Sequence, residues 1–436
     1  MTDVVVVGAG LAGLSAALRA AELGARVTLL EKGGEAYPCN SRMSGGNLHV
    51  ARLSPYTEPA RLRAAIDATT GGWIDPWARD LVVDNAPRTV EWLIGHGAQV
   101  APRSGGEHEQ CVLHPTTGRT GDRLEPDGRG PDVLLRRLAD ELARVGVDLA
   151  TDTEVTDVRP ADAGWTVGTA GGARLTADRV VLADGGFQAD RALAAEHLGL
   201  ADGIPVRRNA GSGRGFGLTT CLRLGAATTS LGAFYGCLVG LDALTDPTLL
   251  PYPIFDYLAR AGVLIDRSGH HVVDERLGGV VMANTLARHG DRHGWVIVDN
   301  AGWEAVGRVG LASPQERLAD LPSAVRAATL PDLLRRIGLN PARVLTSADV
   351  GEAVRDRVRV PPYFAFPVVP AVTHTMGGPV VDTTLTVLDT ASRRIPGLAA
   401  VGSAAGGFEG GPLAGYVGGL LRGAVTAVVW AEAAYR

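Results

Sequence analysis

Residues 4–34 read VVVVGAGLAGLSAALRAAELGARVTLLEKGG. The four valines predict a buried strand, the alanine- and leucine-rich segment after them has helical spacing, and VTLLEK has the composition of a second strand. The glycines between the first strand and the helix match the pattern G-x-G-x-x-G. A strand, a glycine turn, a helix and a second strand in about thirty residues are typical of a dinucleotide-binding α/β unit. The stretch therefore predicts a nucleotide cofactor.

Each glycine of this turn has its own expected role. Gly8 permits the sharp turn out of the strand, Gly10 lets a pyrophosphate approach the backbone, and Gly13 lets helix and strand pack closely. The N-terminus of the helix offers N–H groups and a positive dipole end to the phosphates. Glu31, 18 residues beyond Gly13, is expected to accept hydrogen bonds from ribose hydroxyls. The turn alone does not distinguish NAD from FAD, and a glycine turn without a ligand is the alternative interpretation.

The composition argues against several kinds of function. The chain has 436 residues, of which 46% are hydrophobic and 20% are charged, and its net charge of -5 gives no reason to expect nucleic acid or a membrane as a partner. The four cysteines are far apart and form no C-x-x-C pair, so we expect reduced thiols and no metal site. We find no apolar run of about 18 residues that could span a membrane. A first strand that begins by Asp3 leaves no room for a signal peptide, so a cytoplasmic protein is expected.

The rest of the chain alternates helical and strand patterns. Helical spacing recurs in five segments, at 76–97, 131–145, 214–224, 315–337 and 348–357. A hairpin is expected to lead into an apolar strand at 179–183, and LAAVG predicts a late strand before a final helix from about Gly418. From about residue 236 the sequence contains more prolines and aromatic residues, including PTLLPYPIFDYLARAG. We interpret this change as the start of an inserted domain.

Further motifs occur in the order found in one family of flavoproteins. They are NSRMSGGNLH at 40–49, VVLADGGFQAD at 180–190, GSGRGFGL at 211–218, GVLIDRSGHHVVDE at 262–275 and HTMGG at 374–378. Over nearly the whole chain, the sequence resembles the fumarate reductase/succinate dehydrogenase flavoproteins, which include 3-ketosteroid and tricarballylate-type dehydrogenases. RIPGLAAVGSAAGG at 394–407 resembles the late segment of FAD-binding two-dinucleotide-fold proteins. FAD is therefore favoured over NAD.

The resemblance implies a fold and a set of cofactor contacts. The fold is α/β, with a Rossmann-like FAD-binding domain of the two-dinucleotide-binding-fold type at 1–235 and 374–436, and an inserted α+β capping domain at 236–373. Relatives with covalent flavin carry a histidine just upstream of the glycines at 45–46, where this chain has Cys39-Asn40-Ser41-Arg42, so non-covalent FAD is expected. The expected FAD contacts are Gly8, Gly10, Leu11, Ala12, Gly13, Glu31, Lys32, Asn40, Ser41, Ser44, Gly45, Gly46, Val155, Ala183, Asp184, Gly185, Gly402, Ser403, Tyr416, Val417 and Gly418.

The family implies hydride transfer between flavin N5 and a carbon next to an electron-withdrawing group, with a cap side chain that moves a proton at the neighbouring carbon. His374 matches the HTMGG histidine that stabilises charge on the substrate; a structural core histidine is the alternative. The family's proton-transfer arginine or tyrosine would stand at Gly279. Leu413 stands where a dicarboxylate-binding arginine would be, and Glu409 where a histidine would be. An anionic dicarboxylate would lose a charge-assisted pair there, so fumarate and succinate are not expected as substrates.

Other side chains must replace the missing proton-transfer residue. The candidate catalytic residues are His374, Tyr363, Arg276 and Tyr235, although each tyrosine also suits a core and the arginine a surface ion pair. His270 and His271 are expected at an exposed hairpin tip. GSGRGFG follows no apolar strand, so no second nicotinamide site is expected and electrons must pass to or from a diffusing donor or acceptor.

These features predict an FAD-dependent dehydrogenase or reductase that acts on a CH–CH bond next to a carbonyl of a neutral or bulky small-molecule substrate. The alternative is an FAD-binding oxidase, or a redox-sensing or assembly module, that lacks this chemistry.

Overall fold

The computed structural model divides the chain into two compact units. Unit 1 comprises Met1–His197, Arg208–Ala233 and His374–Arg436, and unit 2 comprises Leu198–Arg207 and Phe234–Thr373. The residues that the structure describes are 2–34, 39–102, 110–116, 119–120, 123–124, 126–200, 211–249, 253–307 and 318–436.

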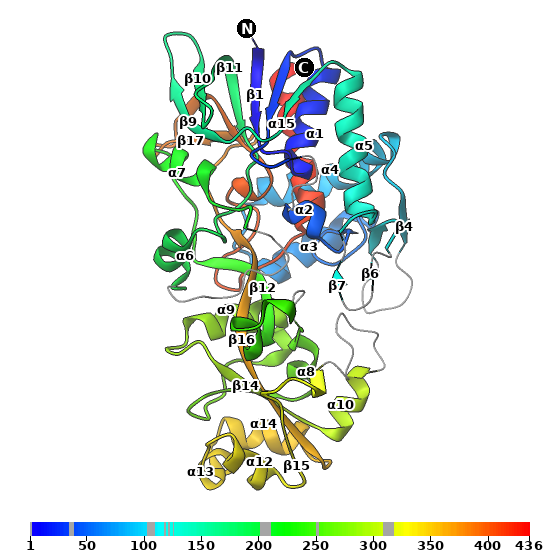
Figure 1. Ribbon diagram of the computed structural model, residues 1–436, viewed down its shortest axis with the longest axis vertical. Coiled ribbons are helices and arrows are strands. Elements are labelled where there is room, and N and C mark those ends of the chain that lie inside the picture. The colour runs from blue at the N-terminus through cyan, green and yellow to red at the C-terminus, as the bar shows by residue number, and fades with distance from the viewer. Residues whose placement is uncertain are drawn as a thin grey trace. The chain divides into compact units, whose positions relative to one another are not determined.

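An eight-stranded sheet forms the centre of unit 1 (Figure 1). Its strands are β1 (Thr2–Val7), β2 (Val27–Leu30), β8 (Asp148–Ala150), β9 (Val155–Pro160), β10 (Trp165–Thr169), β11 (Arg174–Leu182), β17 (Thr386–Leu388) and β18 (Arg394–Ala400). The order is β17-β18-β11-β1-β2-β8, with β10 beside β11 and β9 beside β10. The pairs of β1 with β2 and β11, of β2 with β8, and of β11 with β18 are parallel, and the other three pairs are antiparallel. The predicted Rossmann-like sheet is confirmed.

The run of valines in β1 follows from its central place in this sheet. β1 pairs with β2 on one side and β11 on the other. Val4, Val5 and Val6 have no exposed surface. Successive side chains of a strand point to opposite faces, so a strand that is covered on both faces needs apolar residues at every position.

The first and last helices of the chain pack against each other in unit 1 (Figure 1). The helices of this part of the chain are α1 (Leu11–Glu22), α2 (Asn40–Met43), α3 (Pro59–Thr70), α4 (Pro76–Gly95), α5 (Gly130–Arg144), α6 (Arg191–Leu198), α7 (Phe216–Arg223), the 3-10 turn η4 (Gly402–Ala404) and α15 (Gly419–Tyr435). α15 contacts α1 and α4, and α5 contacts α1. This packing brings the glycine-rich segments from the two ends of the sequence together. A Cβ atom at Gly402 would lie 2.8 Å from the Cβ of Ala12.

Unit 1 also contains short strands outside the central sheet. They are β3 (Asn47–Leu48), β4 (Val100–Pro102), β5 (Cys111–Leu113), β6 (Arg119–Thr120) and β7 (Arg123–Leu124). β5 pairs with both β3 and β4, and β6 pairs with β7. Gly46, just before β3, has a positive φ of 78° and accepts the N–H of Leu113 through its carbonyl oxygen at 2.9 Å. This contact ties the NSRMSGGNLH segment to β5.

Unit 2 contains a five-stranded sheet. Its strands are β12 (Ala233–Gly240), β13 (Val263–Asp266), β14 (Gly294–Asp299), β15 (Val325–Ala327) and β16 (Tyr363–Met376), in the order β12-β16-β14-β13 with β15 beside β16. The helices are η1 (Leu241–Leu244), η2 (Pro247–Leu249), α8 (Asp256–Ala261), η3 (Glu275–Leu277), α9 (Gly279–Arg288), α10 (Asn300–Gly307), α12 (Leu330–Arg336), α13 (Pro341–Thr346) and α14 (Val350–Arg357). One core cluster of unit 2 packs β13, β14 and β16 against α12, α13 and α14.

Two expectations differ from the structure in unit 2. The helical pattern expected at 315–337 is interrupted: residues 318–319 and α12 are helical, the strand β15 lies between them, and residues 315–317 lie outside the described ranges. Thr329 explains the late start of α12, because its hydroxyl oxygen accepts the N–H of Asp332 at 3.3 Å and so caps the helix. His270 is exposed as expected, but His271 lies 2.8 Å from Glu275 through Nε2 and is not a free hairpin tip.

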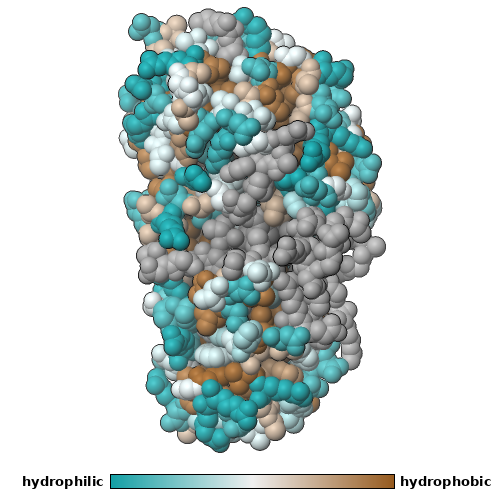
Figure 2. Space-filling model, viewed as in Figure 1, coloured by the Kyte–Doolittle hydropathy of each residue, from teal (hydrophilic) through white to brown (hydrophobic). Residues whose placement is uncertain are grey.

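No helix in the described ranges has the length and apolar composition to cross a bilayer. On the face shown in Figure 2, hydrophobic residues lie as separate patches among hydrophilic ones. The most exposed large apolar side chains, such as Leu277 at 52% and Tyr56 at 49%, come from different segments. Single exposed apolar residues of this kind are normal on protein surfaces.

Candidate cofactor and substrate site

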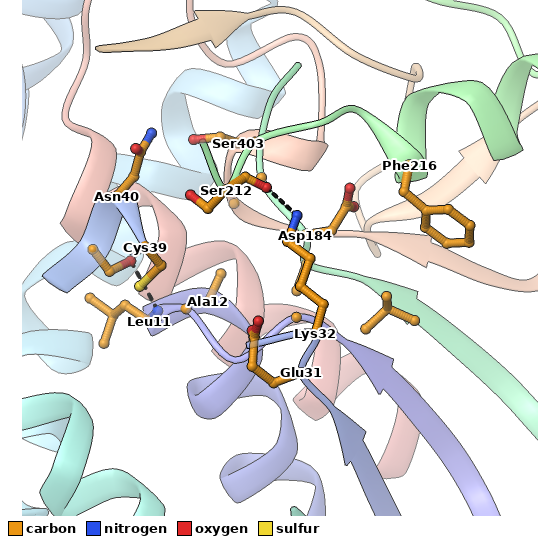
Figure 3. Close-up of a pocket in the computed structure, with 18 of the residues that line it drawn as sticks. Leu11, Ala12, Glu31, Lys32, Cys39, Asn40, Asp184, Ser212, Phe216 and Ser403 are labelled. Atoms are coloured by element: carbon orange, nitrogen blue, oxygen red, sulfur yellow. Dashed lines mark hydrogen bonds between the residues drawn. The ribbon is translucent and has the colours of Figure 1, made fainter. Parts of the chain in front are cut away.

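A pocket in unit 1 lies where β1, β2, β11 and β18 end (Figure 3). The carboxyl edge of a doubly wound sheet is the usual place for a nucleotide ligand. Fourteen of the predicted FAD contacts line this pocket: Gly8, Gly10, Leu11, Ala12, Glu31, Lys32, Asn40, Ser41, Val155, Ala183, Asp184, Gly185, Gly402 and Ser403. The N-terminal fingerprint and the late glycine-rich strand therefore meet at one site.

The glycine turn has the shape that a phosphate cradle requires. Gly8 has a φ of 100°, and a Cβ there would lie 2.8 Å from the carbonyl oxygen of Ala183. A Cβ at Gly13 would lie 1.7 Å from the carbonyl oxygen of Gly8. At Gly10 the nearest atom to a Cβ would be Ser41 Oγ at 3.4 Å, an ordinary contact distance. Gly8 and Gly13 are thus required by packing, whereas Gly10 leaves room beside the backbone for a ligand.

Glu31 connects this turn to the end of β2. Its Oε2 accepts the N–H of Ala9 at 2.7 Å, and its Oε1 accepts the N–H of Gly33 at 3.0 Å. Each oxygen of an ionised carboxylate can accept about two hydrogen bonds. The carboxylate therefore holds the turn and has acceptor sites left for a ligand in the pocket.

Lys32 and Asp184 place opposite charges in the same part of the pocket (Figure 3). Lys32 Nζ donates to the carbonyl oxygen of Ser212, and burial lowers the pKa of Lys32. Burial also raises the pKa of Asp184 to about 6. The Oδ2 of Asp184 accepts the N–H of Gly217 at 2.9 Å, near the start of α7. This carboxylate therefore connects β11 to α7 at the pocket wall.

Two buried oxygens at this pocket fit a ligand that donates hydrogen bonds. Among the described residues, Asp184 Oδ1 has no hydrogen-bond partner. The same holds, within the described ranges, for Oε1 of Gln188, whose side chain is 5% exposed. Buried polar atoms normally have partners, and FAD carries the hydroxyl groups that could serve. Together with the open cradle at Gly10, these atoms suit FAD.

Seven predicted FAD contacts do not line the pocket. They are Gly13, Ser44, Gly45, Gly46, Tyr416, Val417 and Gly418. Gly13 lies behind the turn, against Gly8. The N–H groups of Val417 and Gly418 donate to Glu409 at 3.0 and 2.8 Å. The residues of α15 that do line the pocket are Gly419, Leu420 and Gly423.

His374 lies directly behind one wall of the pocket. A Cβ at Gly419, which lines the pocket, would lie 3.4 Å from His374 Cε1. His374 is 6% exposed, and its Nε2 lies 3.4 Å from Glu409 Oε2. The next residue, Thr375, accepts the N–H of Phe187 at 3.1 Å through its hydroxyl oxygen. The HTMGG segment is thereby fixed to the segment that follows β11.

Glu409 and Leu413 differ from the expectation for a substrate-facing pair. Glu409 is 3% exposed, and its carboxylate accepts from backbone N–H groups and faces Arg422 at 3.2 Å. Protein donors therefore surround this carboxylate. Leu413 packs against Gly71, where a Cβ would lie 3.0 Å from Leu413 Cδ1.

The candidate catalytic residues of unit 2 do not share one site. Tyr363 begins β16 and donates its hydroxyl to the carbonyl oxygen of Arg359 at 3.2 Å. Tyr235 lies in β12, where a Cβ at the next residue, Gly236, would lie 2.2 Å from the carbonyl oxygen of Ala371. Eight residues of strand separate 363 from 371, or roughly 26 Å at about 3.3 Å per residue. One small substrate cannot contact both tyrosines.

Arg276 and Gly279 also have defined surroundings in unit 2. The side chain of Arg276 is 82% exposed and lies 2.7 Å from Asp274. A Cβ at Gly279 would lie 2.0 Å from Oδ2 of Asp256, whose Oδ1 accepts the N–H of Leu238 at 2.8 Å. A Cβ at Gly279 would therefore clash with the Asp256 side chain unless that carboxylate moved, so the two positions are coupled.

A family model with the description "FAD binding domain" matches residues 3–415. The chain belongs to this FAD-binding family. It is 25% identical over 441 residues to the NADH:fumarate oxidoreductase of Klebsiella pneumoniae (strain 342), covering 94% of this chain and 45% of that protein. It is 26% identical over 482 residues to the vinyl phenol reductase of Lactiplantibacillus plantarum, covering 94% of this chain and 90% of that protein.

A solved structure supports the same fold for this FAD-binding protein. The 3-ketosteroid delta1-dehydrogenase of Sterolibacterium denitrificans, in complex with 1,4-androstadiene-3,17-dione, is similar with a TM-score of 0.77 at 18% identity. The match covers 100% of this chain and 99% of that one. The predicted family resemblance and FAD-binding fold are confirmed. The chain spans less than half the length of the Klebsiella relative, so it shares only part of that protein.

Thirteen pocket-lining residues of this FAD-binding protein are not among the predicted contacts. They are Val7, Leu30, Cys39, Thr153, Glu154, Gln188, Ser212, Gly213, Arg214, Phe216, Gly419, Leu420 and Gly423. Ser212, Gly213 and Arg214 lie in GSGRGFGL, a motif that supported the family resemblance, so a signal for them was present in the sequence. The three residues of α15 carry no such signal, because only the packing of α15 against α1 brings them to the pocket.

Proposed function

We propose that this protein is an FAD-dependent oxidoreductase that desaturates or reduces a CH–CH bond next to a carbonyl group. Relatives named for fumarate and vinyl phenol, which both contain a carbon–carbon double bond, support CH–CH chemistry. Of these two compounds, only fumarate has that bond next to a carboxyl group. Bound flavin would supply or accept the hydride at N5. The chain's own residues would then bind the substrate and stabilise the charge that develops on it.

The observation that carries this proposal is the place of His374. It is buried, lies behind the pocket wall at Gly419, and is held by Glu409. A fixed donor aimed at the oxygen where charge develops is a large term in such catalysis. We assign to His374 the binding of the substrate's carbonyl oxygen, which requires a proton on Nδ1 because the Nε2 edge of the ring faces Glu409 at 3.4 Å.

A neutral substrate is favoured over a dicarboxylate. Leu413 offers no charge to a carboxylate and packs against Gly71. The nearby cation Arg422 is already paired at 3.2 Å with Glu409, the partner of His374. A second carboxylate brought there would compete with Glu409 for that cation and would lose its own hydration.

A second side chain would transfer the proton at the neighbouring carbon. Tyr363, Arg276 and Tyr235 stay candidates for this role. Of the three, Tyr235 lies nearest to the end of β16 that contains His374, because the next residue, Gly236, packs against Ala371. Arg276 is largely exposed and engaged by Asp274, and Tyr363 is bonded to Arg359.

We propose that FAD is bound without a covalent link and exchanges electrons with a diffusing partner. Burial raises the pKa of the Cys39 thiol, which lines the pocket, and a protonated thiol is a poor nucleophile. The four cysteines are free, which supports a reducing compartment such as the cytoplasm. Acid precipitation should release the whole flavin into the supernatant, and flavin that stays with the protein would contradict this part of the proposal.

Anaerobic mixing tests the proposed reaction. The FAD-loaded protein is mixed with saturated cyclic ketones, and the reduced protein with the matching enones, with succinate and fumarate as the anionic pair. At least one neutral compound should change the flavin spectrum faster than either dicarboxylate. A response to fumarate or succinate alone would contradict the neutral-substrate assignment.

A second candidate function is an FAD-binding oxidase or redox module without CH–CH chemistry. The glycine at 279 favours it, because the family's proton-transfer side chain is absent there and the Asp256 carboxylate occupies the adjacent space. His374→Ala distinguishes the two candidates. It should abolish turnover with retained FAD under the first function, and it should leave activity unchanged under the second.

A further inference from the structure

Four donors converge on the buried carboxylate of Glu409 in unit 1. Its Oε1 accepts the N–H groups of Val417 at 3.0 Å and Gly418 at 2.8 Å. Its Oε2 faces Arg422 Nη2 at 3.2 Å and His374 Nε2 at 3.4 Å. An ionised carboxylate has about four acceptor sites, so each site has one donor.

The proton in the contact with His374 must lie on the histidine. Burial alone would raise the pKa of Glu409. The charge of Arg422 and the hydrogen bond with His374 outweigh that effect and lower the pKa from 4.5 to about 2. Glu409 is therefore ionised at neutral pH and can only accept hydrogen bonds. Nε2 of His374 carries the proton in this geometry, because the contact otherwise has no donor.

Arg422 fixes the carboxylate from the side of the FAD pocket. Its Nη1 donates to the carbonyl oxygen of Gly402 at 2.9 Å, and its Nη2 donates to Ser403 Oγ at 3.3 Å. Gly402 and Ser403 both line the pocket. The orientation of Glu409 is thus set by the same backbone that forms the cofactor wall.

An aromatic contact packs against the other side of the histidine. The ring of Tyr416 lies 5.8 Å from that of His374, centroid to centroid, and the Tyr416 hydroxyl accepts the N–H of Gly419 at 3.0 Å. His49 packs edge-on against Tyr416 at 5.4 Å. The ring of His374 is therefore held both by a charge and by packing.

We propose that Glu409, anchored by Arg422, is a positioning residue that fixes the Nε2 proton and the ring orientation of His374. A carboxylate that orients a histidine in this way fixes a proton on the ring nitrogen that it faces. By analogy with the carboxylate partners of metal-bound histidines, its removal should lower activity about 10- to 100-fold. What the oriented His374 does to a substrate rests on the proposed function; how it is held does not.

Glu409→Gln is the sharpest variant. Its amide oxygen can still accept the backbone N–H groups of Val417 and Gly418, so the loop keeps its contacts. The amide nitrogen would face His374 as a donor and would favour the tautomer with an unprotonated Nε2. Because this change leaves Arg422 without its charge partner, the double variant Glu409→Gln/Arg422→Met is made as well.

Histidine-selective ¹⁵N NMR of the FAD-loaded, substrate-free protein reads the tautomer directly. The chain has 10 histidines, and the His374 signals are assigned by their absence in His374→Gln. The wild type should show a protonated Nε2 at His374, and both variants should shift this signal. Glu432→Gln is the matched control, since Glu432 is also a paired carboxylate of unit 1 but contacts Arg19 and Arg88. It should leave the His374 signals in place.

Kinetics supply the second measurement. With a neutral substrate found by anaerobic mixing, Glu409→Gln should lower kcat about 10- to 100-fold while FAD stays bound. Unchanged His374 signals, or an unchanged kcat, would overturn the proposal. Loss of FAD or of the folded state in both variants would also overturn it, because Glu409 would then serve the fold. If the wild type turns over no substrate, the proposed function fails while the NMR result still decides the positioning role.

Discussion

Gly13 packs against Gly8 so closely that a Cβ at Gly13 would lie 1.7 Å from the Gly8 carbonyl oxygen. Gly13 lies in α1 and the clashing oxygen belongs to the backbone just after β1, so this clash cannot be relieved by a side-chain rotation. Gly10, three residues earlier, has only Ser41 Oγ near, at 3.4 Å. The two glycines therefore serve different purposes, one in packing and one in ligand approach.

Gly13→Ala and Gly10→Ala separate these purposes. Gly13→Ala should lower the free energy of unfolding of the flavin-free protein by about 3 kcal/mol or more, because it overpacks a fixed contact. Gly10→Ala should leave that stability nearly unchanged and should weaken FAD binding. Thermal unfolding and FAD titration of both variants measure the two effects. Equal destabilisation by both would contradict the distinction.

A buried ion pair holds the α2 segment beside the pocket. Arg42 Nε lies 2.7 Å from Asp132, and both side chains are under 10% exposed. The second partner, Asp127, is 68% exposed. Asp132→Asn should cost about 3 kcal/mol of stability, because it leaves a buried charge poorly compensated. Asp127→Asn is the matched control and should cost under about 1 kcal/mol. Chemical denaturation of both variants decides this, and equal costs would contradict it.

Asp184 should make the stability of the flavin-free protein fall as pH rises. Burial raises its pKa from 3.8 to about 6. The folded state thus disfavours the ionised form, and the associated stability is fully present below about pH 3.8 and lost as pH rises through about 6. Thermal unfolding of Asp184→Asn, compared with the wild type over this range, should show the variant gaining relative stability at the higher pH. The exposed Asp148→Asn is the control. A pH-independent difference for Asp184→Asn would contradict the assignment.

His271 should contribute stability with its own pH dependence. Its hydrogen bond to the buried Glu275, at 2.8 Å, raises its pKa above 6.5. The contribution should be fully present below about pH 6.5 and should be lost as pH rises through the higher folded pKa. His271→Asn should therefore be destabilised by about 1–3 kcal/mol below pH 6.5, and by less at alkaline pH. His270→Asn, at an exposed site, is the control and should show no such trend.

Local sequence patterns were sufficient for the sheet and for the N-terminal half of the pocket. The valine run, the glycine turn and Glu31 lie within one stretch, and their roles depend on neighbours a few residues away. The late strand could be placed because its glycine-rich pattern resembles that of other flavoproteins. The resulting pocket brings Ala12 and Gly402 together, as this interpretation required.

The roles of Glu409 and Gly279 depend on contacts between residues far apart in the chain, which the sequence does not reveal. Glu409 reads as a substitution in a substrate motif, yet it serves as an acceptor for Arg422 and His374, which lie 13 and 35 residues away in the chain. The strand β15 was missed because three residues of strand between polar segments give no periodic signal. The sequence showed that Gly279 lacks the side chain expected from the family. Only the structure showed that the Asp256 side chain occupies the adjacent space.

Titration of the flavin-free protein with FAD, in parallel with FMN and NAD, tests most directly whether the glycine-rich segments from both ends of the chain form one FAD pocket. FAD should bind at one molecule per chain with a change in its visible spectrum, Gly10→Ala should weaken this binding, and NAD should not compete. A chain that remains colourless with FAD, or that binds NAD in its place, would contradict the assignment of this pocket.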